Sequence, residues 1–134
     1  MIDLVDYTVS YTLVNGAVPG VVESWNGIVD CGGVSIWELP VTSFIAWTQH
    51  MQQGYHVRSG YLTFVNAPWI LQNAGRIILP LFDPFLSEKT RFLGTDFKPF
   101  LHKVLGKENL EKKFGGWIPD KKADFFPPRY NAKG

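Results

Sequence analysis

Hydrophobic and polar positions change their period in the middle of the chain. Tyr61–Val65 is a short run of aromatic and β-branched residues, which is typical of a buried strand. After Pro68 the apolar residues recur every three to four positions, which indicates a helix as far as Phe82. Thr90–Leu93 then has the composition of a second strand, and Gly94 ends it. The order strand, helix, strand predicts a βαβ unit with a parallel pair of strands.

The helix predicted at Trp69–Phe82 has a wide apolar surface. Its polar side chains fall in one narrow arc: Gln72, Asn73 and Arg76. Its apolar side chains cover roughly half of the circumference or more: Ile70, Leu71, Ala74, Ile77, Ile78, Leu81 and Phe82. One side can lie on a sheet, and the rest must contact another layer of protein, a partner, a membrane or a lipid. A well-buried helix also fits the pattern. We expect Pro80 to kink it.

The flanking segments predict further helices and one more strand. Val21–Val29 has a strand pattern, Val41–Gln53 a helical one, and Asp96–Leu105 that of an amphipathic helix. Residues 2–14 alternate apolar and polar side chains as a strand does. Asp30 follows a predicted strand and precedes two glycines, so it either carries chemistry at the end of that strand or caps a turn.

Composition and motifs narrow the function. The chain has 134 residues, 46% of them apolar, with a net charge of +1 and no basic stripe, which disfavours a nucleic-acid binder. The single cysteine, Cys31, is most simply a buried apolar residue. The three histidines lack neighbours at metal-ligand spacing, and no nucleophile elbow or phosphate loop is present. We therefore expect no enzyme, no metal and no cofactor.

A series of short motifs occurs in a characteristic order. They are Phe64–Pro68 (FVNAP), Arg76, Pro80–Pro84 (PLFDP), Lys89, Phe92–Gly94, Glu108–Leu110 and Lys113–Gly116. This series closely resembles the CRAL-TRIO lipid-binding domain, whose members carry phosphatidylinositol, retinaldehyde and tocopherol. The resemblance runs from about Val21 to Gly116.

The resemblance implies the fold. It predicts an α/β domain with a mostly parallel sheet that floors an apolar pocket and is covered by helices, one of them a mobile gate helix. Residues 1–119 would be a truncated lipid-binding domain and residues 120–134 an extended, proline-containing tail. Because the family has a helix at residues 2–14, we expect a helix there despite the alternating pattern.

The resemblance also implies a set of lipid-binding residues. They are Trp25, Gly27, Arg58, Trp69, Ile70, Ile77, Ile78, Leu81, Phe82, Phe85 and Lys89. Lys89 stands where some members contact a headgroup phosphate, although an exposed loop lysine is an equal alternative. The acid that precedes the arginine in these members is replaced by Val57. Trp25 and Gly27 replace two hydroxyl residues of the phosphocholine site and cannot repeat their contacts. Headgroup recognition is therefore not expected to carry over.

These features predict non-enzymatic binding, transfer or sensing of a lipid or other small hydrophobic molecule. The alternative is a protein interaction module that uses the same apolar helix. No basic run, signal peptide or membrane span is evident, so we expect a cytoplasmic protein that meets membranes transiently and binds no nucleic acid. In the tail, Pro127–Tyr130 fits the motif bound by WW domains, which predicts a WW-domain partner. The alternative is that the tail packs on its own domain.

The family's usual opening helices and first strand would precede Met1. Their absence here would leave an unpaired sheet edge or an open pocket wall. We expect a homodimer in which Val5–Leu13 supplies a strand to a second copy, or a monomer that binds lipid poorly.

Overall fold

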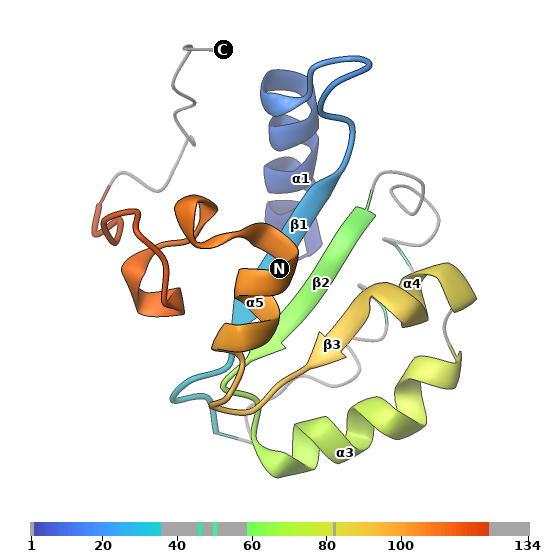
Figure 1. Ribbon diagram of the computed structural model, residues 1–134. Coiled ribbons are helices and arrows are strands. Elements are labelled where there is room, and N and C mark those ends of the chain that lie inside the picture. The colour runs from blue at the N-terminus through green and yellow to red at the C-terminus, as the bar shows by residue number, and fades with distance from the viewer. Residues whose placement is uncertain (1, 36–45, 47–49, 51–58, 82, 124–134) are drawn as a thin grey trace. The chain divides into compact units, whose positions relative to one another are not determined.

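The computed structural model describes residues 2–35, 46, 50, 59–81 and 83–123. The chain forms two compact units, Met1–Gly94 and Thr95–Gly134 (Figure 1). The first unit contains α1 (Ile2–Gly16), β1 (Trp25–Asp30), β2 (Ser59–Val65), α3 (Trp69–Ile78), the 3₁₀ helix η2 (Leu79–Leu81), α4 (Pro84–Lys89) and β3 (Thr90–Phe92). The second contains α5 (Lys98–Leu105) and two 3₁₀ helices, η3 (Lys107–Asn109) and η4 (Lys112–Phe114).

The described strands form a parallel sheet in the order β1-β2-β3. β2 is central, and its side chains Leu62, Thr63, Phe64 and Val65 are all buried. Gly27 pairs with Leu62, and Phe64 pairs with Phe92, so these four residues share one face of the sheet. The predicted α/β class with a parallel sheet is confirmed.

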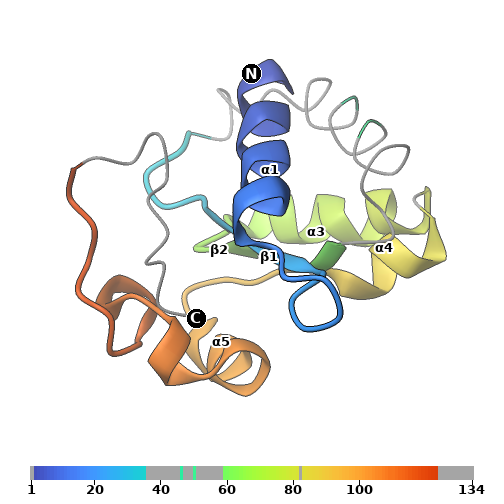
Figure 2. The ribbon, with the colours of Figure 1, turned by 90° about the horizontal axis from the view of Figure 1, so that it is seen from above.

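The predicted βαβ unit is also present, as β2–α3–η2–α4–β3, and α3 runs alongside the sheet in both ribbon views (Figures 1 and 2). The single helix expected to reach Phe82 ends at Ile78 instead and tightens into η2 around Pro80. Proline has no N–H for the α-helical bond, and its ring crowds the preceding turn. Asp83 then begins α4 by accepting a hydrogen bond from the Phe85 N–H at 2.9 Å.

Two expectations about the first thirty residues are resolved. Residues 2–16 form helix α1, so the helix expected from the family is confirmed and Val5–Leu13 is not a strand that a second copy could receive. The strand expected from Val21 begins only at Trp25. Val18 and Val22 are bridged by two hydrogen bonds of 2.8 and 2.7 Å, and this turn occupies the residues before the strand.

The helix predicted at Val41–Gln53 lies almost wholly outside the described residues; its members Ala46 and His50 are described and are helical. The proline-containing tail from residue 124 also lies outside them.

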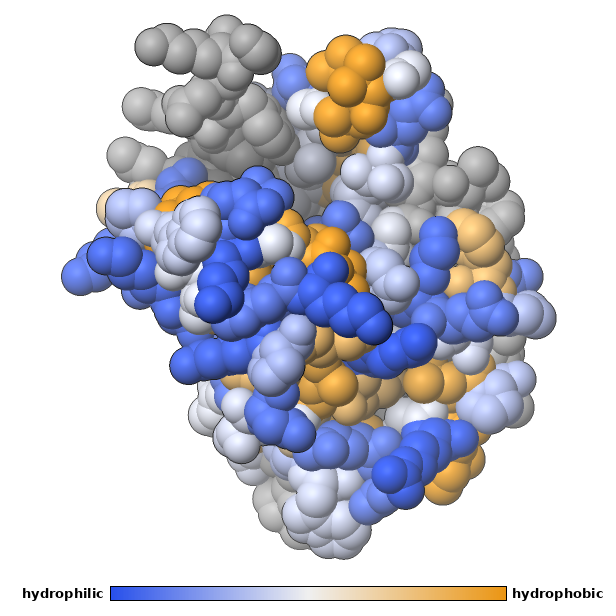
Figure 3. Space-filling view, in the orientation of Figure 1, coloured by the Kyte–Doolittle hydropathy of each residue, from blue (hydrophilic) through white to orange (hydrophobic). Residues whose placement is uncertain are grey.

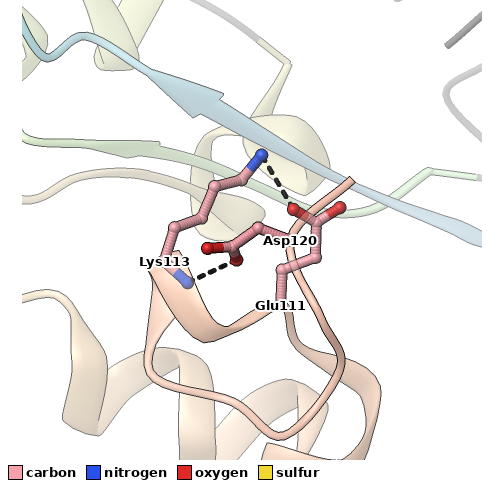
Figure 4. Close-up of polar contacts among 3 residues, drawn as sticks. All are labelled: Glu111, Lys113 and Asp120. Atoms are coloured by element: carbon pink, nitrogen blue, oxygen red, sulfur yellow. Dashed lines mark hydrogen bonds and ion pairs between the residues drawn. The ribbon is translucent and has the colours of Figure 1, made fainter. Parts of the chain in front are cut away.

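The second unit is built around α5, as the amphipathic pattern predicts. Leu101 of α5 and Phe97, which stands just before its first turn, are buried. Gly106 ends the helix with a φ of 77° that favours glycine. The segment after it folds back in two 3₁₀ turns. There the Phe114 ring packs edge to face on the Phe97 ring, with the ring centroids 6.3 Å apart. Figure 4 shows Lys113 held from both ends: its Nζ lies 2.8 Å from Glu111 Oε2, and its backbone N–H donates to Asp120 Oδ1 at 2.8 Å.

Candidate functional site

One face of the sheet supports α3 through a small apolar cluster. Its buried members are Cys31, Leu62 and Phe64, with Leu71 of α3 and Phe92 of β3 packed against them. The Phe64 and Phe92 rings stack with centroids 4.6 Å apart and an interplanar angle of 11°. Gly75 is the buried residue of α3. A Cβ built at Gly75 would lie 2.5 Å from the Phe92 ring, so glycine permits this close approach of helix and sheet.

The sheet covers only part of the apolar surface of α3. Ile78 is half-buried, whereas Ile77 is 74% exposed and Trp69 70% exposed. Ile70 of α3 and Phe85 of α4 are exposed as well. In the space-filling view, apolar atoms reach the surface among polar ones in the region of the sheet and of α3 and α4 (Figure 3). The excess of apolar surface inferred from the sequence is therefore present on the folded helix.

The two β1 residues expected near a headgroup lie against one another. A Cβ at Gly27 would lie 3.1 Å from the Trp25 ring and 2.9 Å from Leu62, so the indole occupies the space above the glycine. The Trp25 Nε1 atom is buried and has no hydrogen-bond partner in the described part of the chain. Asn26, between them, accepts a hydrogen bond from the Tyr61 N–H at 2.7 Å, beside an irregularity in the β1–β2 register.

Lys89 and Phe85 of α4 are in contact. The Lys89 ammonium lies 3.7 Å from the centre of the Phe85 ring, which is a cation–π geometry. Of the other expected site residues, Leu81 lies in η2, and Arg58 and Phe82 lie outside the described residues, as does Val57. The structure thus joins the expected residues in pairs on β1 and on α4.

Asp30 has a structural position. Its Oδ1 accepts from the Gly32 N–H at 2.8 Å and from the Asn66 side chain at 2.9 Å. The capping interpretation is confirmed, and these bonds join the turns that follow β1 and β2. Asn66 itself has a φ of 53°, which asparagine tolerates better than most residues.

Cys31 follows Asp30 and is buried. Burial raises the pKa of its thiol, and the nearby Asp30 carboxylate raises it further. A cysteine reacts as its thiolate, and the neutral thiol is a poor nucleophile. This environment therefore suits packing. Among the described residues, no group of three or more His, Cys, Asp or Glu side chains could hold a metal ion.

The supporting residues Gly75 and Phe92 were not predicted as part of the site. The alternation of β2 could have placed Leu62 and Phe64 on one face, but only the parallel pairing with β3 puts Phe92 beside Phe64.

Residues 3–116 match the CRAL/TRIO domain family. The chain belongs to this family. CRAL/TRIO domains bind lipids or other small hydrophobic ligands. Among its relatives, the SEC14 cytosolic factor of Kluyveromyces lactis is 35% identical over 97 residues, which is 71% of this chain and 32% of that protein. The SEC14 cytosolic factor of Candida glabrata is 33% identical over the same shares. Human clavesin-2 is 36% identical over 72 residues, 52% of this chain and 21% of that protein.

The chain therefore spans about a third of the length of the SEC14 cytosolic factors that it matches. In the part of the chain that the structure describes, no helix has both the length and the apolar character needed to cross a membrane.

Proposed function

We propose that this chain is a non-enzymatic binder of a lipid or other small hydrophobic molecule, and that α3 and the sheet face beneath it form its binding site. The observation that carries the proposal is the apolar surface of α3 that the sheet leaves uncovered, notably Ile77 and Trp69. Membership of the CRAL/TRIO family supports the same ligand class.

The crossover supplies a means of admitting a ligand. α3 is tied to the sheet by Gly75 against Phe92, and η2 with Pro80 follows at its carboxyl end. A proline junction is a place where a helix bends. We place the gate motion there: α3 and η2 swing away from the sheet at a membrane surface, and the acyl or isoprenoid part of the ligand enters. Transfer or sensing of that ligand would follow from the same motion.

Recognition of the polar end is expected to differ from that of the phosphatidylinositol carriers. The Trp25 indole lies above Gly27. By the family resemblance, these two residues replace the two hydroxyl residues of the phosphocholine site. The buried Nε1–H of Trp25 is a donor without an acceptor among the described residues, and a buried donor left unpaired costs about 1–3 kcal/mol. An ester carbonyl of a bound lipid is a suitable acceptor. Lys89 is held over the Phe85 ring.

The test is lipid uptake from liposomes, followed by extraction and mass spectrometry of the protein-bound lipid. Ile78 is half-buried and lies seven residues after Leu71, so both lie on the face of α3 that packs on the sheet. Ile78→Asp places a carboxylate on that face, where burying an ionised group costs several kcal/mol, and should abolish uptake. The matched control is Asn73→Asp, which adds the same charge at an exposed position of the same helix and should leave uptake unchanged. Unchanged uptake by folded Ile78→Asp would remove α3 from the site.

A second candidate function is protein interaction through the same surface. The exposure of Trp69 and Ile77 favours it, because exposed aromatic and aliphatic residues on one helix also suit a partner protein. A homodimer is one form of this candidate, since β1 and β3 each pair on one side only within the described sheet. A concentration-dependent dimer in light scattering, with no lipid taken up, would favour it over the first proposal. We further propose a cytoplasmic site of action at the surface of membranes.

A further inference from the structure

The second unit presents an exposed tryptophan on a firmly held loop. Trp117 is 67% exposed and Ile118 42% exposed. They end the segment that we call the Trp117 loop, residues 107–118. Its backbone is bonded back on itself: the Trp117 N–H donates to the Lys107 carbonyl and the Ile118 N–H to the Leu110 carbonyl, both at 2.9 Å. The Lys112 N–H in turn donates to the Ile118 carbonyl at 2.8 Å.

The interior of the unit holds this loop in place. Leu110 is buried at its centre, and the Phe114 ring packs edge to face on Phe97, the residue that precedes α5. Gly115 adopts a φ of 86°, and the carbonyl of the same residue contacts His102 Nε2 at 3.0 Å. These three contacts fix the loop, so the exposed indole of Trp117 is held at a defined position.

The described residues of the second unit carry a net positive charge, and within the Trp117 loop three lysines stand against two glutamates. Residues 95–123 carry seven lysines against four carboxylates, whereas residues 1–94 carry four basic and seven acidic side chains. Two of the four carboxylates, Glu111 and Asp120, are engaged with Lys113. Lys107 and Lys112 are exposed, form no ion pair within the described residues, and are joined through their backbones to Trp117 and Ile118.

We propose that the Trp117 loop docks on the surface of an anionic lipid bilayer. Tryptophan is favoured at the level of the headgroups, where its ring is apolar and its N–H is wet, and lysines near an anionic surface are attracted to it. One indole, one isoleucine and two lysines suffice for such a contact. A protein partner of ordinary affinity buries about 800 Å² on each side, whereas the exposed apolar part of this loop is one indole and one isoleucine. This docking is separate from the ligand site proposed on α3.

The experiment is co-sedimentation of the full chain with vesicles of phosphatidylcholine alone and of phosphatidylcholine mixed with phosphatidylserine. We expect tighter binding to the mixed vesicles, weakening as salt is added. Lys107→Gln and Lys112→Gln should each lower that binding about fivefold, which corresponds to ~1 kcal/mol for a lysine at an anionic surface. Trp117→Ala should lower it about tenfold through the lost apolar contact.

The matched control is Lys103→Gln, which removes the same charge from an exposed position of α5 and should change binding less than about twofold. Trp117→Gln replaces Trp117→Ala if the latter does not fold. The proposal is overturned if the wild type shows no preference for the mixed vesicles, or if folded Trp117 and Lys112 variants bind them as the wild type does; docking on an acidic protein would give that second result.

The failure of this proposal is distinguishable from failure of the ligand proposal. Uptake of a fluorescent fatty acid supplied as a monomer in solution needs no bilayer, so Trp117→Ala should retain it. Ile78→Asp should lose that uptake and keep its binding to the mixed vesicles.

Discussion

Gly75→Ala is the sharpest test of how α3 is held on the sheet. In an exposed helix this change stabilises a protein by about 1 kcal/mol, because glycine has the more flexible unfolded chain. At this position the new methyl group would stand 2.5 Å from Phe92 Cδ2 and 2.9 Å from Cε2. Real Cβ atoms do not approach carbon so closely, so either the helix or the ring must move.

The Phe92 ring is partly buried and is held by stacking. It is stacked on Phe64, which is buried in the centre of the sheet, and displacing it would give up an aromatic contact of about 0.5–1.5 kcal/mol. Overpacking a well-filled interior costs typically about 1–3 kcal/mol. The steric cost exceeds the propensity gain, so we expect Gly75→Ala to lower the free energy of unfolding by about 1–2 kcal/mol.

Denaturant unfolding followed by circular dichroism measures this difference. Asn73→Ala is the control, because it raises helix propensity at an exposed position of α3 and should be neutral or slightly stabilising. Phe92→Leu should relieve the clash, so that Gly75→Ala costs less in the Phe92→Leu background than in the wild type, a positive coupling in a double-mutant cycle. A Gly75→Ala protein at least as stable as the wild type would refute the close approach of α3 to the sheet.

The remaining predictions concern Lys89 and Cys31. Phosphatidylinositol should bind no better than phosphatidylcholine of equal chain length, because Val57 stands in place of the headgroup acid. Lys89→Gln should change neither affinity, because Lys89 is held over the Phe85 ring. A Lys89-dependent preference for phosphatidylinositol in a lipid-transfer assay would contradict this. Burial and Asp30 raise the pKa of the Cys31 thiol in the folded protein, so iodoacetamide should alkylate the native protein far more slowly than the urea-unfolded one. The raised pKa stabilises the folded protein fully below the unfolded pKa, near 9, and this contribution is lost as pH rises through the folded value. The resulting fall in the free energy of unfolding should be smaller in Cys31→Ala. Equal alkylation of native and unfolded protein would contradict the burial of Cys31.

Local signals in the sequence determined β2 and α3, the first two elements of the βαβ unit. Aromatic and β-branched residues specify β2 because they suit a buried, pleated surface, and the proline-bounded segment after it specifies a helix. The apolar excess of that helix follows from its composition and is present as exposed Ile77 and Trp69. Asp30 could be assigned to a turn because a short acidic side chain before glycines bonds to nearby backbone N–H groups.

Tertiary structure decided the features for which local pattern and packing compete. The alternation in residues 2–14 favours a strand, yet the segment is helical, with side chains bonded four residues back from Thr12 to Thr8 and from Asn15 to Tyr11. Gly75 approaches Phe92 because of the strand register, which brings β3 beneath α3. The Trp25 ring lies above Gly27 because of the rotamer that the tryptophan adopts. A sequence lists which side chains are available, whereas strand pairing in three dimensions selects which of them touch, because a shift of one residue moves every side chain to the other face.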